Sequence, residues 1–175
     1  MKIEVRISGL GGQGVVLAGQ ILGKAAAYDG KNAVQTQSYG AEARGSAAKS
    51  EVIISDNKIG FPIARKFDIL VAMSQEAVEK SIPNLKENGI LLVDSNALKD
   101  MPKAHAKIYV IPATEIAEKV FGQKLYANIV MLGALTKILN IISEEAMEKA
   151  IKNIVPKKAV SINLQAYRKG TELIK

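Results

Sequence analysis

The feature that most constrains the fold is a glycine-rich turn placed directly between a predicted strand and a predicted helix. The segment KIEVRIS alternates apolar and polar side chains, which predicts a strand over residues 2–8. Gly9, Gly11 and Gly14 follow in a G-x-G-x-x-G arrangement, and apolar residues then recur with helical spacing as far as YDGKN. Glycines permit positive φ angles and close approach of the main chain, so such a turn can aim amide groups at an anion. A tight turn that binds nothing has the same pattern, and the turn by itself leaves both interpretations open.

A dinucleotide site needs one more residue than this turn supplies. An Asp or Glu about 20 residues beyond the glycines should end the second strand and bind the ribose hydroxyls. The predicted second strand, NAVQTQSY, ends in uncharged side chains, and Asp29 comes before it rather than at its end. A stand-alone Rossmann-type oxidoreductase that binds NAD(P) or FAD is therefore disfavoured and remains only the alternative.

The rest of the chain predicts a single α/β domain over residues 1–175. Strands are predicted at residues 50–56, 67–74, 89–95 and 107–113, and a helix interrupted by Pro83 at residues 75–88. After Pro112 the pattern becomes helical, at residues 113–122, 128–140 and 143–154 and again beyond Pro156, with Ser143 as an expected N-cap. This alternation is typical of a three-layer α/β/α domain with a mainly parallel sheet and a helical C-terminal part. Glu4 and Arg6 predict that one face of the first strand is polar or meets another subunit.

Composition excludes several functional classes. The chain has no cysteine and one histidine, His105, so we expect no disulfide, no cysteine-ligated iron–sulfur cluster and no metal site. Its net charge is +7, but the lysines are scattered and aromatic residues make up only 5%, so we expect no nucleic-acid partner. The longest apolar run, residues 129–135, is far shorter than the roughly 18 residues of a membrane span, so a soluble, cytoplasmic protein without membrane contact is expected.

A second polar segment, SYGAEARGSAAKSEV, follows the second predicted strand. It carries Tyr39, Glu42, Arg44 and Gly45 at the carboxyl end of that strand, where ligands and partners collect in open α/β sheets. A planar guanidinium suits the recognition of carboxylate or phosphate groups. On chemistry alone, the segment is equally well a solvated turn with a surface ion pair.

Three segments, GLGGQGVVLAGQILGKAA, SYGAEARGSAAKSEVIIS and NIVMLGAL, resemble the gamma subunit of the 2-oxoacid:ferredoxin oxidoreductases. The resemblance covers essentially the whole chain. Ser46 stands where the family usually has a glycine, and Ala41 where it often has a proline. Residues that match the family's glycine turn are Gly9, Gly11, Gly12, Gln13 and Gly14, those that match its second loop are Tyr39, Glu42, Arg44 and Gly45, and Asn128 matches an asparagine that begins a later helix. Asn128 is alternatively a plain N-cap.

The resemblance implies a complex that converts a 2-oxoacid, coenzyme A and oxidised ferredoxin into acyl-CoA, carbon dioxide and reduced ferredoxin, with 2-oxoglutarate as the preferred substrate. Thiamine diphosphate, Mg and [4Fe-4S] clusters would be held by alpha, beta and delta-type subunits. This chain would be structural and gating, with no catalytic residue of its own. Its glycine turn is a candidate site for an anion, for coenzyme A or for a partner chain. We expect both loops at one edge of the sheet and expect Gly133 to permit close helix packing.

Overall fold

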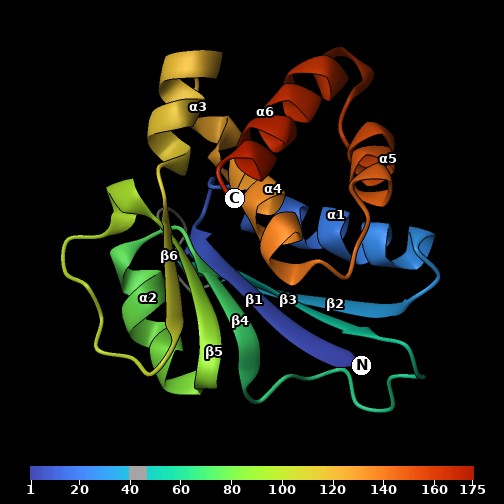
Figure 1. The fold of residues 1–175 in the computed structure, drawn as a ribbon, viewed down its shortest axis with the longest axis vertical. Coiled ribbons are helices and arrows are strands. Elements are labelled where there is room, and N and C mark those ends of the chain that lie inside the picture. Colours follow the sequence, from blue (N-terminus) through green and yellow to red (C-terminus); the bar gives the residue numbers. More distant parts are fainter. Residues whose placement is uncertain (40–46) are drawn as a thin grey trace.

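The computed structural model describes residues 1–39 and 47–175, which form a twisted sheet covered unequally by helices (Figure 1). The six strands lie in the order β2-β3-β1-β4-β5-β6. β3 is antiparallel to both of its neighbours, so the other five strands share one direction and the prediction of a mainly parallel sheet is confirmed. The strands are β1 (Lys2–Leu10), β2 (Asn32–Tyr39), β3 (Ala47–Ser55), β4 (Phe67–Ala72), β5 (Leu85–Asp94) and β6 (Lys107–Ile111).

Helices cover both faces of the sheet, which confirms the three-layer arrangement. One face carries the larger group: α1 (Val15–Tyr28), α3 (Ala113–Phe121), α4 (Ala127–Leu139), α5 (Glu144–Ile154) and α6 (Val160–Glu172). The opposite face carries α2 (Gln75–Ser81). Short 3-10 turns connect these elements at η1 (Ile82–Asn84), η2 (Ser95–Ala97), η3 (Lys124–Tyr126) and η4 (Lys157–Ala159). No helix in the described ranges has the length and apolar character needed to cross a bilayer.

The main core lies between the sheet and the larger helical layer, with α4 at its centre. Eleven residues of α4 are buried, because the helix is packed between the sheet and α6. Gly133 makes this packing possible, since a Cβ there would lie 2.1 Å from the carbonyl oxygen of Tyr167 and 2.9 Å from Cα of Gly170. The expectation that Gly133 permits close packing is confirmed.

The opposite face of β1 is polar, as its sequence predicted. Arg6 is buried, pairs with Glu51 at 2.7 Å and lies 3.8 Å above the ring centroid of Phe67. Glu4 is also buried, and Lys86 binds it at 3.2 Å. These charges are compensated within the chain, because a buried ion without a partner would be strongly destabilising.

Several element boundaries differ from the prediction. The helix expected over residues 75–88 ends at Ser81, and β5 begins at Leu85 rather than at residue 89. Pro83 cannot donate a helical hydrogen bond, and Leu85 already pairs with Phe67 of β4. β1 and β3 are each longer than predicted, because Gly9 pairs with Ala48 and thereby extends both strands toward the glycine turn.

The predicted N-cap of α5 is confirmed. The Ser143 hydroxyl accepts a hydrogen bond from the Ala146 amide at 3.1 Å. It also donates to Asp29 at 2.8 Å, so the residue that came too early for a ribose site instead connects the end of α1 to the start of α5.

Candidate functional site

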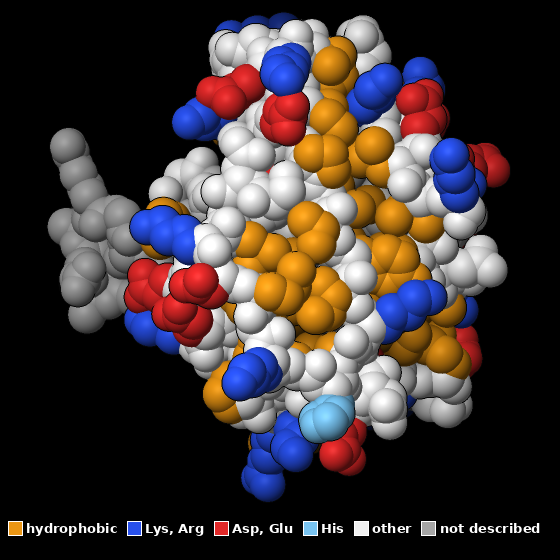
Figure 2. All heavy atoms as spheres, turned by 60° about the vertical axis from the view of Figure 1, so that its left-hand side comes forward, with side chains coloured by type: hydrophobic (Ala, Val, Ile, Leu, Met, Phe, Trp, Pro, Cys, Tyr) orange, Lys and Arg blue, Asp and Glu red, His pale blue; other side chains and the backbone are white. Residues whose placement is uncertain are grey.

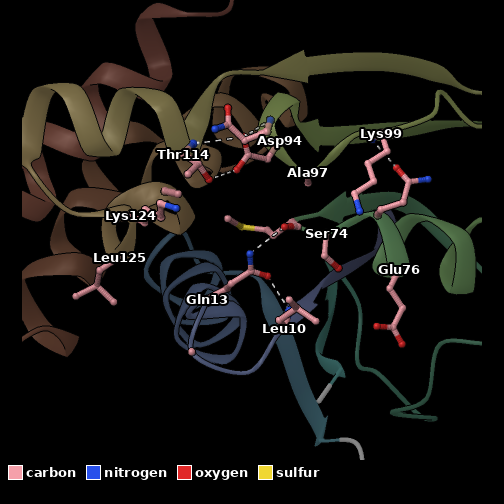
Figure 3. Close-up of a pocket in the computed structure, with 15 residues that line it drawn as sticks. Leu10, Gln13, Ser74, Glu76, Asp94, Ala97, Lys99, Thr114, Lys124 and Leu125 are labelled. Carbon is pink, nitrogen blue, oxygen red and sulfur yellow. Dashed lines mark hydrogen bonds between the residues drawn. The ribbon is translucent and has the colours of Figure 1, made fainter. Parts of the chain in front are cut away.

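A cavity lies where the strand order reverses, between the carboxyl ends of β1 and β4 (Figure 3). Its volume is about 520 Å³. The glycine turn forms one wall, and the starts of α2 and α3, the end of β5 and η3 form the others. Crevices at this position of open α/β sheets are the usual ligand sites, so the cavity is the candidate site of this chain.

The glycine turn has the left-handed geometry that its glycines predict. Gly12 has a φ of 89° and Gly14 a φ of 73°, and Gly14 is the N-cap of α1. The first turn of α1 has neither a capping side chain nor an acidic residue. Within the described ranges, the Gly12 amide donates to no acceptor. The Gly12 amide, together with a helix start that no side chain caps, favours an anionic ligand or partner group.

The side chain of Gln13 makes hydrogen bonds to main-chain groups on both sides of the cavity mouth. Its Oε1 accepts a hydrogen bond from the Leu10 amide at 2.6 Å, and its Nε2 donates to the Met73 carbonyl oxygen at 2.9 Å (Figure 3). The Gln13 amide closes the turn on the Leu10 carbonyl at 3.1 Å. The sequence placed Gln13 among the candidate ligand residues, and in the structure its carboxamide holds the turn against β4.

Asn128 is brought to the glycine turn from the other end of the sequence. Its Nδ2 donates to the Gly14 carbonyl oxygen at 3.0 Å, and its side chain is only 2% exposed. The N-cap interpretation is wrong, because α4 begins at Ala127 and its N-cap is Tyr126. Asn128 lies one residue inside the helix, where its side chain can reach the turn, so the structure brings it into contact with the glycine turn.

The residues of the opposite wall were not predicted from the sequence. Asp94 ends β5, is 1% exposed and accepts hydrogen bonds from the Thr114 hydroxyl and, at 3.3 Å each, from the amides of Thr114 and Asn96. The available signal was an Asp directly after the apolar run ILLV, at the carboxyl end of a parallel strand. These bonds fix the start of α3 relative to β5, so the wall is preformed.

The charges of the cavity are mixed, with two exposed lysines. Lys99 and Lys124 line it together with Glu76. Gln75 accepts a hydrogen bond from the Lys99 amide at 2.9 Å, which holds the segment that carries Lys99 beside α2. No group of three or more possible metal ligands occurs in the ranges that the structure describes. The glycine turn and the two lysines suit the binding of a polar, anionic group.

The second predicted loop can be placed only by its flanks. Glu42, Arg44 and Gly45 lie outside the described residues. Tyr39 ends β2, is 63% exposed and pairs with Ala48, which in turn pairs with Gly9. The points where this loop leaves and rejoins the sheet therefore lie at the same edge as the glycine turn.

The sheet order gives no support to a dinucleotide site. In a Rossmann sheet the second strand lies directly beside the first, so its terminal carboxylate reaches the ribose of a nucleotide on the turn. Here the antiparallel β3 separates β1 from β2. The end of β2 is thus two strand spacings from β1, roughly 10 Å, and it carries no acidic side chain before Tyr39.

Comparison with known proteins agrees with this architecture. The family model described as pyruvate ferredoxin/flavodoxin oxidoreductase matches residues 4–173. A 2-oxoglutarate synthase subunit, KorC, from Methanocaldococcus jannaschii is 54% identical, over 100% of this chain and 95% of that protein. The gamma subunit of a keto/oxoacid ferredoxin oxidoreductase from Geobacter sulfurreducens has a TM-score of 0.87 and 45% identity, over 97% of this chain and 96% of that one.

A third similarity is to a longer polypeptide. The 2-oxoglutarate:ferredoxin oxidoreductase from Magnetococcus marinus, solved with 2-oxoglutarate, coenzyme A and succinyl-CoA bound, has a TM-score of 0.89 and 26% identity. The match covers 98% of this chain and 31% of that one. From the family match and the full-length similarities, we conclude that the chain belongs to the pyruvate ferredoxin/flavodoxin oxidoreductase family.

Proposed function

We propose that this chain is the gamma subunit of a 2-oxoacid:ferredoxin oxidoreductase whose substrate is 2-oxoglutarate. The complex would convert 2-oxoglutarate, coenzyme A and oxidised ferredoxin into succinyl-CoA, carbon dioxide and reduced ferredoxin. The observation that carries the proposal is the 54% identity, over the full length of this chain, to a 2-oxoglutarate synthase subunit.

The chemistry of the reaction belongs to other chains of such a complex. Thiamine diphosphate with Mg would activate the 2-oxoacid and [4Fe-4S] clusters would carry the electrons, held by subunits of the alpha, beta and delta type. This sequence contains no cysteine for a cluster. The residues of this chain therefore contribute binding, orientation and exclusion of water.

The cavity at the switch point suits an approach path for coenzyme A. Coenzyme A carries phosphate groups, and the Gly12 amide, the start of α1 and the lysines Lys99 and Lys124 all favour negative charge. Lysine side chains here attract a phosphate as mobile point charges, whereas the turn provides fixed donors. In this role the subunit holds the anionic part of coenzyme A while its thiol reaches a partner chain.

The surface supports assembly with larger partners. Figure 2 shows hydrophobic side chains gathered in a band on the side of the molecule that carries α3 and β6. Exposed apolar residues of the elements on this side include Val110 of β6, Val120 of α3 and Leu125 of η3, which are 44%, 55% and 54% exposed. We further propose that the loop with Tyr39, Glu42, Arg44 and Gly45 contacts a partner chain or coenzyme A beside the glycine turn.

Affinity purification of the tagged chain from its native source tests the proposal. We expect the thiamine-bearing and cluster-bearing subunits to co-purify with it, with brown colour and with ferredoxin reduction that requires both 2-oxoglutarate and coenzyme A. Turnover by the isolated chain, or recovery of the chain as a free monomer, would contradict the proposal. A complex that used pyruvate instead would contradict only the choice of substrate.

The second loop has its own test in the same preparation. Arg44→Ala should weaken assembly or raise the concentration of coenzyme A needed for half-maximal rate, because the loop would lose its guanidinium. The control is Arg65→Ala, which removes an exposed arginine from another part of the surface. Equal assembly and equal kinetics for both variants would remove the role assigned to Arg44.

A further inference from the structure

The strands β1 and β4 stop pairing where the cavity begins. Their parallel register runs from Val5 opposite Ile69 to Ser8 opposite Ala72, and the Met73 amide donates to the Ser8 carbonyl oxygen at 2.9 Å. In a regular parallel ladder the next hydrogen bond would join the Leu10 amide to the Met73 carbonyl. Both of these groups instead bind the side chain of Gln13.

We propose that Gln13 is a positioning residue whose carboxamide replaces this missing ladder hydrogen bond. Oε1 accepts from Leu10, and Nε2 of the same group donates to Met73, so the carboxamide is inserted between the two strand ends. The insertion holds β1 and β4 apart at the mouth of the cavity, while the Leu10 amide and the Met73 carbonyl both keep a hydrogen-bond partner. It also fixes the turn that carries the Gly12 amide. The consequence for coenzyme A rests on the proposed function.

The surroundings of Gln13 leave room for this inserted carboxamide. A Cβ on Gly9 would lie 2.5 Å from Oε1 of Gln13, and 3.1 Å from both Cβ of Met73 and Cγ1 of Val15. Gly9 has no positive φ angle, so the left-handed conformation does not account for glycine at this position. The space above Gly9 is occupied by the carboxamide, which explains the first glycine of the motif.

The proposal makes a specific chemical demand on residue 13. The side chain must accept from Leu10 and donate to Met73 at the same time, which a carboxamide does and an ionised carboxylate cannot. A protonated carboxyl group has both functions. Gln13→Glu should therefore be defective when the new carboxylate is charged and should recover as it becomes protonated.

The test uses the assembled complex with three variants: Gln13→Met, Gln13→Glu and the control Gln20→Met. Gln20 is exposed on α1 and its side chain makes no hydrogen bond within the described ranges. The measurements are the KM for coenzyme A and kcat at saturating 2-oxoglutarate, together with hydrogen exchange of the Leu10 amide. For Gln13→Met we expect a roughly tenfold higher KM for coenzyme A, equal to about 1.4 kcal/mol, with little change in kcat and faster exchange at Leu10.

The pH dependence of Gln13→Glu separates positioning from a loss of folding. Its Leu10 exchange, relative to Gln20→Met at each pH, should be fast near pH 7.5 and return toward the control as the pH falls through the usual glutamate pKa of about 4.3, where the carboxyl group becomes protonated. An unchanged KM for coenzyme A in Gln13→Met, or pH-independent exchange in Gln13→Glu, would overturn the inference. If the wild-type complex lacked activity dependent on coenzyme A, the proposed function would fail, and the exchange measurements would still decide the role of Gln13.

Discussion

Replacement of Gly14 by alanine tests how the glycine turn is built. At a φ of 73°, alanine costs roughly 1–2 kcal/mol in the left-handed region. Its Cβ would also lie 2.2 Å from Nδ2 and 3.0 Å from Cγ of Asn128. Asn128 would have to give up its hydrogen bond to the Gly14 carbonyl, and leaving such buried groups unpaired costs about 1–3 kcal/mol. We therefore expect Gly14→Ala to lower the free energy of unfolding by roughly 2–5 kcal/mol.

Two further variants isolate the contact with Asn128. Gly12→Ala has a similar backbone penalty, at a φ of 89°, but its Cβ would meet no atom within 4 Å. It should cost only the roughly 1–2 kcal/mol of the left-handed conformation. Asn128→Ala removes the clashing amide, so the double variant with Gly14→Ala should be more stable than the sum of the single effects by about 1 kcal/mol or more.

Denaturant unfolding followed by circular dichroism measures the stability of all four variants relative to the wild-type chain. The reasoning is refuted if Gly14→Ala is no less stable than Gly12→Ala, or if the effects of Gly14→Ala and Asn128→Ala are additive. Either result would mean that the turn relaxes away from α4 without cost.

Two further predictions concern the packing and charge of the helical layer. Gly133→Ala should lower the free energy of unfolding by about 2 kcal/mol or more, because its Cβ would meet the main chain of Tyr167. Gly23→Ala should raise the free energy of unfolding by up to about 1 kcal/mol, since the nearest atoms to its Cβ would be 3.9 Å away. Equal changes for the two variants in thermal unfolding would contradict this prediction. Hydrogen bonds of 2.8 and 3.1 Å from Arg168 lower the pKa of Glu148 in the folded chain. The stabilisation by this ion pair is therefore complete above the unfolded pKa of about 4.3 and is lost as the pH falls through the lower folded pKa. Glu148→Gln should thus cost roughly 0.5 kcal/mol near pH 7 and progressively less below pH 4, and a cost that did not depend on pH would contradict the assignment.

One wall of the candidate site, the glycine turn, could be predicted from local sequence, but the other walls and the contacts within the site could not. The glycines and Gln13 form a contiguous motif, so their position after a strand and before a helix was readable from periodicity. The contact between Gly14 and Asn128 joins residues 114 positions apart, and no local pattern reports such a distance. Asp94 and Thr114 are each ordinary in sequence and become one wall only because β5 and α3 meet.

The fold shows the same division between local and distant interactions. Alternation along the strands and helical spacing after Pro112 were sufficient for an α/β domain with a helical C-terminal part. The start of β5 was predicted four residues too late, because Lys86, Glu87 and Asn88 have no strand pattern and lie where the register between β4 and β5 shifts, between the pairs Phe67–Leu85 and Ile69–Ile90. The antiparallel insertion of β3 was likewise not predictable, since strand order depends on pairing between distant segments.

The amino-acid sequence by itself determined the order of strands and helices and the lack of a cysteine for any cluster, since each depends on residue type or on local spacing, and three of its segments were enough to show the resemblance to the family. The tertiary structure decided what Gln13, Asn128 and Gly133 do. Gln13 and Asn128 make hydrogen bonds of about 3 Å to distant segments, and the main chain of α6 lies too close to Gly133 to leave room for a Cβ. Only the folded chain brings these groups together.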